Sequence, residues 1–121
     1  MRPQAPDSAY LWDMLEISRT VRSILLGVTL DEFMQDRVRQ LSVERGLEII
    51  GEAARRISVG FKHAHGEIPW RDIIGLRNIL AHEYAEVDLE LVWETVTRDI
   101  PKLIELLEEL VPLPPAPEET Q

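Results

Sequence analysis

The chain has 121 residues, of which 45% are hydrophobic, enough for one domain with its own core and too few for two full domains. The chain contains 13 Lys and Arg residues and 22 Asp and Glu residues, which gives a net charge of −9. A broad basic face for nucleic acid is therefore not expected, and any contact with a polyanion is confined to a small local site. The absence of cysteine excludes disulfides, thiolate metal sites and a cysteine nucleophile.

The two ends of the chain differ in composition from its middle. The first ten residues, MRPQAPDSAY, lack the long apolar stretch of a signal peptide, and no run reaches the roughly 18 apolar residues of a membrane span. We therefore expect a soluble, cytoplasmic protein with no membrane partner. Residues 1–6 and the Pro-rich acidic tail 112–121 are expected to be flexible, which leaves residues 7–111 as the folded domain.

The first third of the chain predicts helix. We expect Asp7 or Ser8 to act as the N-cap of a first helix, because short polar side chains accept hydrogen bonds from free N–H groups there. The sequence TLDE then predicts a capping box between Thr29 and Glu32, which opens a short helical turn around Phe33.

A long helix is expected from about residue 36 to residue 58. Its apolar residues alternate steps of four and three, which places them on one stripe that faces the core. The stripe consists of Val43, Leu47, Ile50, Ala54 and Ile57. Gly51 lies beside it, where a missing side chain lets a neighbouring helix approach closely.

The second half predicts two further helices after a turn-rich connector over residues 59–68. Pro69 suits the first position of the next helix, where its missing N–H costs nothing, and Asp88 suits the N-cap of the last helix. Pro101 should kink or split that last helix, because it removes a backbone hydrogen bond and clashes with the preceding turn. The fold class predicted is all-α, a bundle of four to five helices.

The stretch RNILAHEY, residues 77–84, carries three polar groups that suit phosphate chemistry. Histidine titrates near neutral pH and so moves protons, whereas arginine stays charged and presents a planar fork to phosphate oxygens. On one ideal helix Arg77 and Tyr84 share a face, but His82 points roughly 140° away from Arg77 at about 100° per residue. The three converge only if the helix ends near His82 or if a second subunit supplies one of them.

Several features of the sequence also have simple structural readings. Arg77, His82 and Tyr84 are compatible with the polar edge of an amphipathic helix. His63 and His65 have a spacing seen in metal sites, but they lie in the expected connector. The acids Glu44, Glu48 and Glu52 are spaced as a solvated helix face, although one of them is placed to pair with Arg77 across the bundle.

Three segments in order resemble the HepT-type toxins of the HEPN superfamily. They are LEIIGEAARRIS, IPWRDIIGLRNILAHEY and VDLELVWETVTRDIP, and the resemblance extends over residues 9–110. The pattern Arg-x4-His-x-Tyr in GLRNILAHEY is that family's signature. The resemblance implies an HEPN-type helical bundle that forms a homodimer, in which the motifs of both subunits face one cleft.

The same resemblance implies the toxin of a type VII toxin–antitoxin system, a metal-independent endoribonuclease without a cofactor. Arg77 and His82 would be catalytic, Asn78 would support the site, and a minimal nucleotidyltransferase antitoxin would silence the toxin by attaching AMP to Tyr84. Family members often have asparagine where this chain has Gly46, and we expect this departure to loosen local packing or the cleft edge. Two alternatives remain at this point: a non-catalytic module that binds a nucleotide or the nucleotidyltransferase, and a helical scaffold.

Overall fold

The computed structural model of the chain describes residues 6–80 and 87–111, and all the regular structure in these ranges is helical. The prediction of an all-α fold is therefore confirmed. The elements in chain order are α1 (Pro6–Leu25), α2 (Leu30–Gln35), α3 (Arg37–Arg56), α4 (Val59–Ala64), α5 (Trp70–Ile74), α6 (Leu76–Leu80), α7 (Leu89–Glu94), the π-helical turn η1 (Thr95–Asp99) and α8 (Ile100–Leu110).

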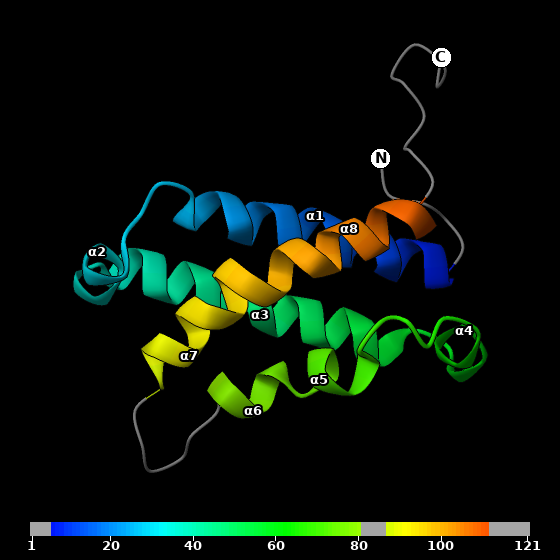
Figure 1. The fold of residues 1–121 in the computed structure, drawn as a ribbon. Coiled ribbons are helices and arrows are strands. Elements are labelled where there is room, and N and C mark those ends of the chain that lie inside the picture. The colour runs from blue at the N-terminus through cyan, green and yellow to red at the C-terminus, as the bar shows by residue number, and fades with distance from the viewer. Residues whose placement is uncertain (1–5, 81–86, 112–121) are drawn as a thin grey trace, which may run out of the picture.

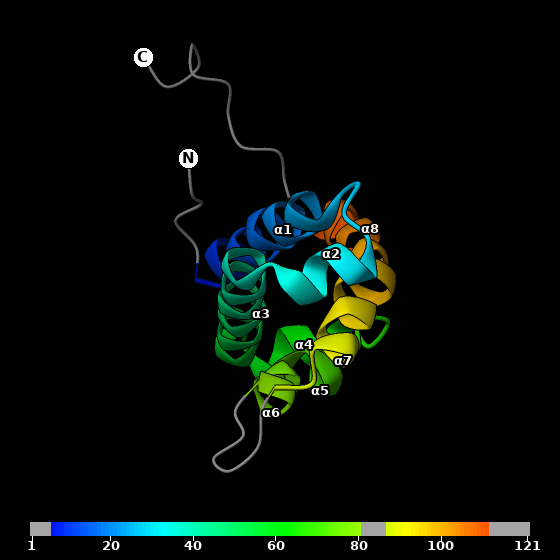
Figure 2. The ribbon, with the colours of Figure 1, turned by 90° about the vertical axis from the view of Figure 1, so that its left-hand side faces the viewer.

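The long elements form an antiparallel bundle. In Figure 1, α1 and the α5–α6 pair run in one direction, whereas α3 and the α7–η1–α8 run return in the other. Figure 2 looks along the bundle and shows α1, α3, α8 and the α5–α6 pair placed around a common centre. The short helices α2 and α4 lie at opposite ends of the bundle (Figure 1). This up-down-up-down order follows from the short connections between neighbouring helices.

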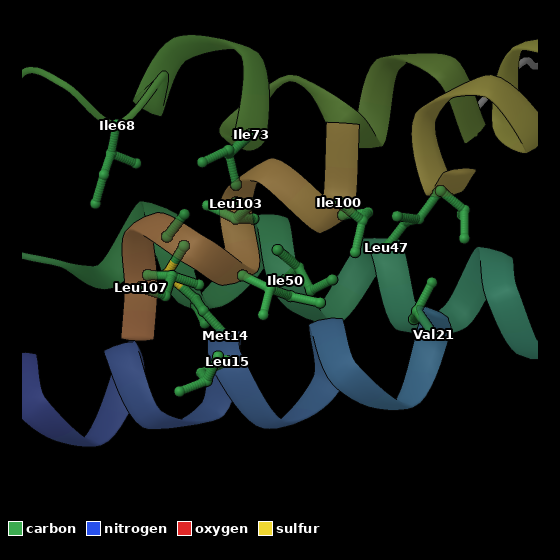
Figure 3. Packing of buried hydrophobic residues seen from close by; sticks show 14 of the residues in the cluster. Met14, Leu15, Val21, Leu47, Ile50, Ile68, Ile73, Ile100, Leu103 and Leu107 are labelled. Carbon is green, nitrogen blue, oxygen red and sulfur yellow. The ribbon is translucent and has the colours of Figure 1, made fainter. Parts of the chain in front are cut away.

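One continuous hydrophobic core fills the centre of the bundle. Figure 3 shows its side chains converging from α1, α3, α5 and α8, with Ile68 from the connector closing one end. Every residue of the predicted stripe of α3 is buried, and the corresponding stripe of the last helix is buried from Val92 to Leu107. Burying a side chain of this size typically contributes about 1.5–3 kcal/mol, so both stripes stabilise the bundle.

The capping box predicted at α2 is present. The Thr29 hydroxyl accepts a hydrogen bond from the Glu32 N–H, and the Glu32 carboxylate accepts one from the Thr29 N–H. The prediction that Asp7 or Ser8 caps α1 is wrong, because α1 already begins at Pro6. The Asp7 carboxylate instead accepts hydrogen bonds from the N–H and hydroxyl of Ser58, which joins the start of α1 to the start of α4.

The connector expected over residues 59–68 contains a helix. Ser58 caps α4 by accepting a hydrogen bond from the Phe61 N–H, and the segment has no buried residue within the helix itself. Its short length and lack of an apolar stripe explain why periodicity did not reveal it. The Trp70 indole N–H donates to the His65 carbonyl at 3.0 Å and ties the connector to α5.

The disruption expected near Pro101 takes the form of a π-helical turn. The helical run from Leu89 to Leu110 continues through η1, where the Ile100 N–H donates to the Thr95 carbonyl five residues earlier. Such a turn inserts one extra residue before the proline, which accommodates the hydrogen bond that Pro101 cannot make. The last helix is therefore split into α7 and α8 as predicted.

Two glycines of α3 mark the closest approaches between helices. A Cβ atom on Gly51 would lie 3.0 Å from the carbonyl oxygen of Ile73 in α5, as expected for a helix packed against a missing side chain. A Cβ atom on Gly46 would lie 2.2 Å from Cγ2 of Val21 in α1. The expectation that Gly46 loosens the packing is wrong, because α1 and α3 are in tight contact at this position.

Among the helices in the described ranges, none is both long and apolar enough to span a membrane. Of the ends expected to be flexible, residues 1–6 and 112–121, all but Pro6 lie outside the described residues, and Pro6 belongs to α1.

Replacing Gly46 with alanine is expected to destabilise the bundle. The new methyl group collides with the buried Val21 side chain, and overpacking of this kind typically costs about 1–3 kcal/mol, more than the gain in helix propensity. Gly60→Ala in α4 is the matched control, because its Cβ meets open space and alanine favours helix by up to about 1 kcal/mol. Urea unfolding followed by circular dichroism measures both, and a Gly46→Ala variant as stable as the wild type would contradict the packing.

The capping box makes stability depend on pH. Hydrogen bonds from Thr29 hold the pKa of Glu32 below its ordinary value of 4.5. A lowered pKa means that the stabilisation is fully present above the ordinary value and is lost as pH falls through the folded-state value. Glu32→Gln should therefore unfold at a lower urea concentration than the wild type at pH 7. At pH 3 the difference between the urea midpoints of the two proteins should be smaller. An unchanged gap between the two proteins at both pH values would refute this.

Candidate active site

Arg77, the motif arginine, is the second residue of α6 and is exposed. The sequence predicted one helix from Pro69 onward, but the structure breaks it at Gly75. The Gly75 N–H still donates to the Arg71 carbonyl at 2.9 Å, whereas the Asn78 N–H donates to the Gly75 carbonyl at 2.8 Å, only three residues back. This tight turn starts α6 afresh and sets the direction in which Arg77 projects.

Arg77 lines a groove of about 490 Å³ between α1, α3 and the α5–α6 pair. We call it the arginine groove. Its lining residues are Tyr10, Asp13, Arg45, Glu48, Ile49, Gly51, Glu52, Ala53, Arg55, Arg56, Ile74 and Arg77. Four arginines thus surround one hollow on a chain whose net charge is −9.

Ion pairs along α3 engage the arginines of that helix but not Arg77. Arg45 lies 2.6 Å from Glu48, and Glu52 lies 2.8 Å from Arg55 and 3.5 Å from Arg56. Within the two described ranges, Arg77 forms no ion pair, so its guanidinium is available to a ligand. The alternative that an acid of α3 pairs with Arg77 is not found there.

The charges of the groove are reinforced by hydrogen bonds. The Arg55 guanidinium, assisted by Arg56, lowers the pKa of the Glu52 carboxyl. A hydrogen bond with Tyr10 raises the pKa of the Arg56 guanidinium. These groups therefore keep their full charges at neutral pH, and the groove presents fixed cations with carboxylates between them.

Asn78 does not line the arginine groove. It faces a second groove, of about 570 Å³, between the α5–α6 pair and the η1–α8 segment, together with Asp99 and Lys102. Successive residues of a helix project about 100° apart, so neighbours such as Arg77 and Asn78 open onto different sides. In one subunit the structure separates these two residues rather than bringing them together.

His82 and Tyr84 lie outside the described residues. The described part of α6 ends at Leu80, and the chain is described again from Val87. The predictions that the helix ends near His82 and that the site is completed across a dimer therefore stay predictions. The predicted N-cap that follows is confirmed, because the Asp88 carboxylate accepts a hydrogen bond from the Leu91 N–H at 3.1 Å.

Glu44 differs from the other two acids of α3. Its Oε2 atom is buried and has no hydrogen-bond partner in the described part of the chain. Glu44 lies seven residues before Gly51, two turns of the same helix face, and Gly51 is where α5 and α6 are packed. A solvated face, as the sequence suggested, does not describe this carboxylate.

The two histidines of the connector differ in their surroundings. The ring of His65 packs on that of Phe61 with centroids 4.2 Å apart, and its Nδ1 lies 3.4 Å from a carboxylate oxygen of Glu67. His63 lies on α4 and is exposed. Across the described ranges, no three His, Asp or Glu side chains gather as a metal site would require.

Sequence reasoning missed the arginines that α3 contributes. Arg45, Glu48, Glu52 and Arg55 follow one another by steps of three, four and three, the same arithmetic that identified the buried stripe. They form a second stripe on the exposed face of the helix. The signal was present in the sequence, but only the position of α6 shows that this stripe borders Arg77.

Comparison with known proteins matches residues 14–110 to the family described as "Ribonuclease HepT-like". A protein of Thermococcus cleftensis named "Probable ribonuclease HepT" is 40% identical over 94 residues, covering 78% of this chain and 86% of the relative. "Putative RNase MJ1380" of Methanocaldococcus jannaschii is 39% identical over 95 residues, covering 78% and 87%. No solved structure gives a significant match. The matched segment contains the Arg-x4-His-x-Tyr motif and every arginine of the arginine groove, and the chain belongs to the HepT-like family of the HEPN superfamily.

Proposed function

We propose that this protein is an endoribonuclease toxin that cleaves RNA without a metal ion and acts as a homodimer. The observation that carries the proposal is the exposed Arg77, which projects into a groove with four arginines and has no ion pair in the described ranges. Support also comes from relatives whose names describe ribonucleases. The resemblance of three segments of the sequence to HepT-type toxins implies the same activity.

The chemistry needs one group that moves a proton and one that stabilises charge. The 2′-oxygen of the RNA attacks the adjacent phosphorus, the P–O5′ bond breaks, and the products carry a 2′,3′-cyclic phosphate and a 5′-hydroxyl. His82 takes the proton from the 2′-hydroxyl and returns one to the departing 5′-oxygen. Arg77 donates hydrogen bonds to the phosphate oxygens as negative charge builds on the five-coordinate phosphorus.

A homodimer fits the geometry of a single subunit. Arg77 and Asn78 open onto different grooves, so one subunit does not present them to the same phosphate. A twofold axis that places the motifs of two subunits at one cleft supplies the missing groups from the partner. Asn78 would then support the site from the second subunit.

We further propose that Tyr84 is the site of neutralisation. A cognate minimal nucleotidyltransferase would transfer AMP from ATP to the Tyr84 hydroxyl, so that the new P–O bond forms as pyrophosphate leaves. The added phosphate and base would occupy the cleft beside Arg77 and exclude RNA directly. The type VII toxin–antitoxin assignment rests on this step.

The purified protein should cleave RNA in the presence of EDTA and leave cyclic phosphate ends. His82→Ala should reduce the cleavage rate by at least a hundredfold, the usual contribution of a general acid–base group, whereas the fold stays intact. Denaturing gels follow the cleavage, and circular dichroism follows the fold.

His63→Ala is the matched control, because His63 is an exposed histidine of α4 away from the arginine groove. Its activity should equal that of the wild type. Unmodified wild-type protein that binds RNA but cleaves no RNA under these conditions would refute the enzyme proposal and favour the binding module.

Co-expression with the neighbouring nucleotidyltransferase should add mass to the protein in multiples of one AMP unit. Intact-protein mass spectrometry measures this, and Tyr84→Phe should abolish the gain because the acceptor hydroxyl is gone. Tyr10→Phe removes the only other tyrosine of the chain and should leave the gain unchanged. A mass gain that survives Tyr84→Phe would place the modification elsewhere.

A further inference from the structure

We infer that Arg45, Arg55 and Arg56 of α3 form a binding track for the RNA strand that flanks the scissile phosphate. The inference rests on the proposed function, because it takes Arg77 as the group at the reacting phosphate. It adds substrate-positioning residues outside the Arg-x4-His-x-Tyr motif and defines the ligand as single-stranded RNA several nucleotides long.

The spacing of the three arginines matches an extended polyanion. Arg45 and Arg55 lie ten residues apart on one face of α3, which separates their Cα atoms by about 15 Å at 1.5 Å per residue. Each strand of a base-paired helix carries one phosphate per about 3.4 Å of axis and an extended single strand carries fewer, so the track covers at most about four phosphates. Arg77 reaches the same groove from α6, so one strand can contact both helices.

The side chains are accessible and already oriented toward solvent. Arg45, Arg55 and Arg56 keep 69%, 60% and 58% of their side-chain surface exposed. A guanidinium carries five N–H donors, so the contacts that each makes with a neighbouring carboxylate leave donors for phosphate.

The carboxylates between the arginines do not prevent binding. Exposed ion pairs of neighbouring residues on a helix are weak, so a phosphate that forms a bidentate contact can displace them. Glu48 and Glu52 instead hold the arginines near the groove and limit its net positive charge. This arrangement predicts that neutralising either carboxylate should strengthen RNA binding.

The experiment measures binding of a labelled 12-nucleotide RNA whose 2′-hydroxyls are methylated, which removes the attacking group and separates binding from cleavage. Fluorescence anisotropy gives the affinity from 50 to 200 mM salt. Arg55→Gln/Arg56→Gln should weaken binding roughly 10- to 30-fold at 0.1 M salt and reduce the salt slope by about 1.4, since each phosphate contact on a single strand contributes about 0.7.

Two further variants and a control test how much individual charges contribute to RNA binding. Arg45→Gln should weaken binding about fivefold, the effect of one phosphate contact at 0.1 M salt, whereas Glu52→Gln should strengthen it. Arg98→Gln makes the same charge change on η1, at an exposed arginine that lines neither groove, and should bind RNA like the wild type. In Arg45→Gln the kcat/KM for cleavage of the 12-nucleotide RNA should fall.

Each other result would overturn the track. Wild-type protein that does not bind the methylated RNA, or variants of α3 that bind like Arg98→Gln, would exclude the track even if cleavage proceeds. Variants that change the molecular mass in sedimentation would assign the arginines to a subunit interface instead. Binding that depends on these arginines without any RNA cleavage would preserve the track and refute the enzyme, so the two proposals fail separately.

Discussion

At Gly51 the backbone of α5 lies against α3 with no side chain between them, and a Cβ atom there would come within 3.0 Å of the Ile73 carbonyl oxygen. This contact determines how close the α5–α6 pair approaches the long helix. Because the distance is small, the turn at Gly75 and the start of α6 are held beside the exposed face of α3. Arg77 consequently projects over a surface that α3 supplies, and the arginine groove exists because the two helices are this close.

The net charge of the chain places a second constraint on the site. A chain with a net charge of −9 repels nucleic acid over most of its surface, and exposed charges are screened beyond about 8–10 Å at physiological salt. Attraction to RNA would therefore have to come from cations gathered in one place. The groove holds such a cluster, because α3 contributes Arg45, Arg55 and Arg56 to the same hollow as Arg77. An acidic protein thus has a local cluster of cations without a broad basic face.

The features predicted correctly from the sequence are those that depend on neighbouring residues. The capping box at Thr29 involves residues three apart, and the buried stripe of α3 involves residues three and four apart, so both follow from helix geometry. The use of Asp7 to hold Ser58 and the tight contact at Gly46 involve partners on other helices. The residues next to them in the sequence do not indicate which partner they contact, so the corresponding predictions were wrong or were not made.

Arg77 and Asn78 lie on different sides of α6, although they are neighbours in the sequence. A helix separates adjacent side chains by about 100°, and in the described part of one subunit Arg77 lines the arginine groove whereas Asn78 lines the groove beside η1 and α8. The homodimer that we propose offers a way to bring both side chains to one phosphate, because a twofold axis can place the Arg77 side of one subunit against the Asn78 side of the other.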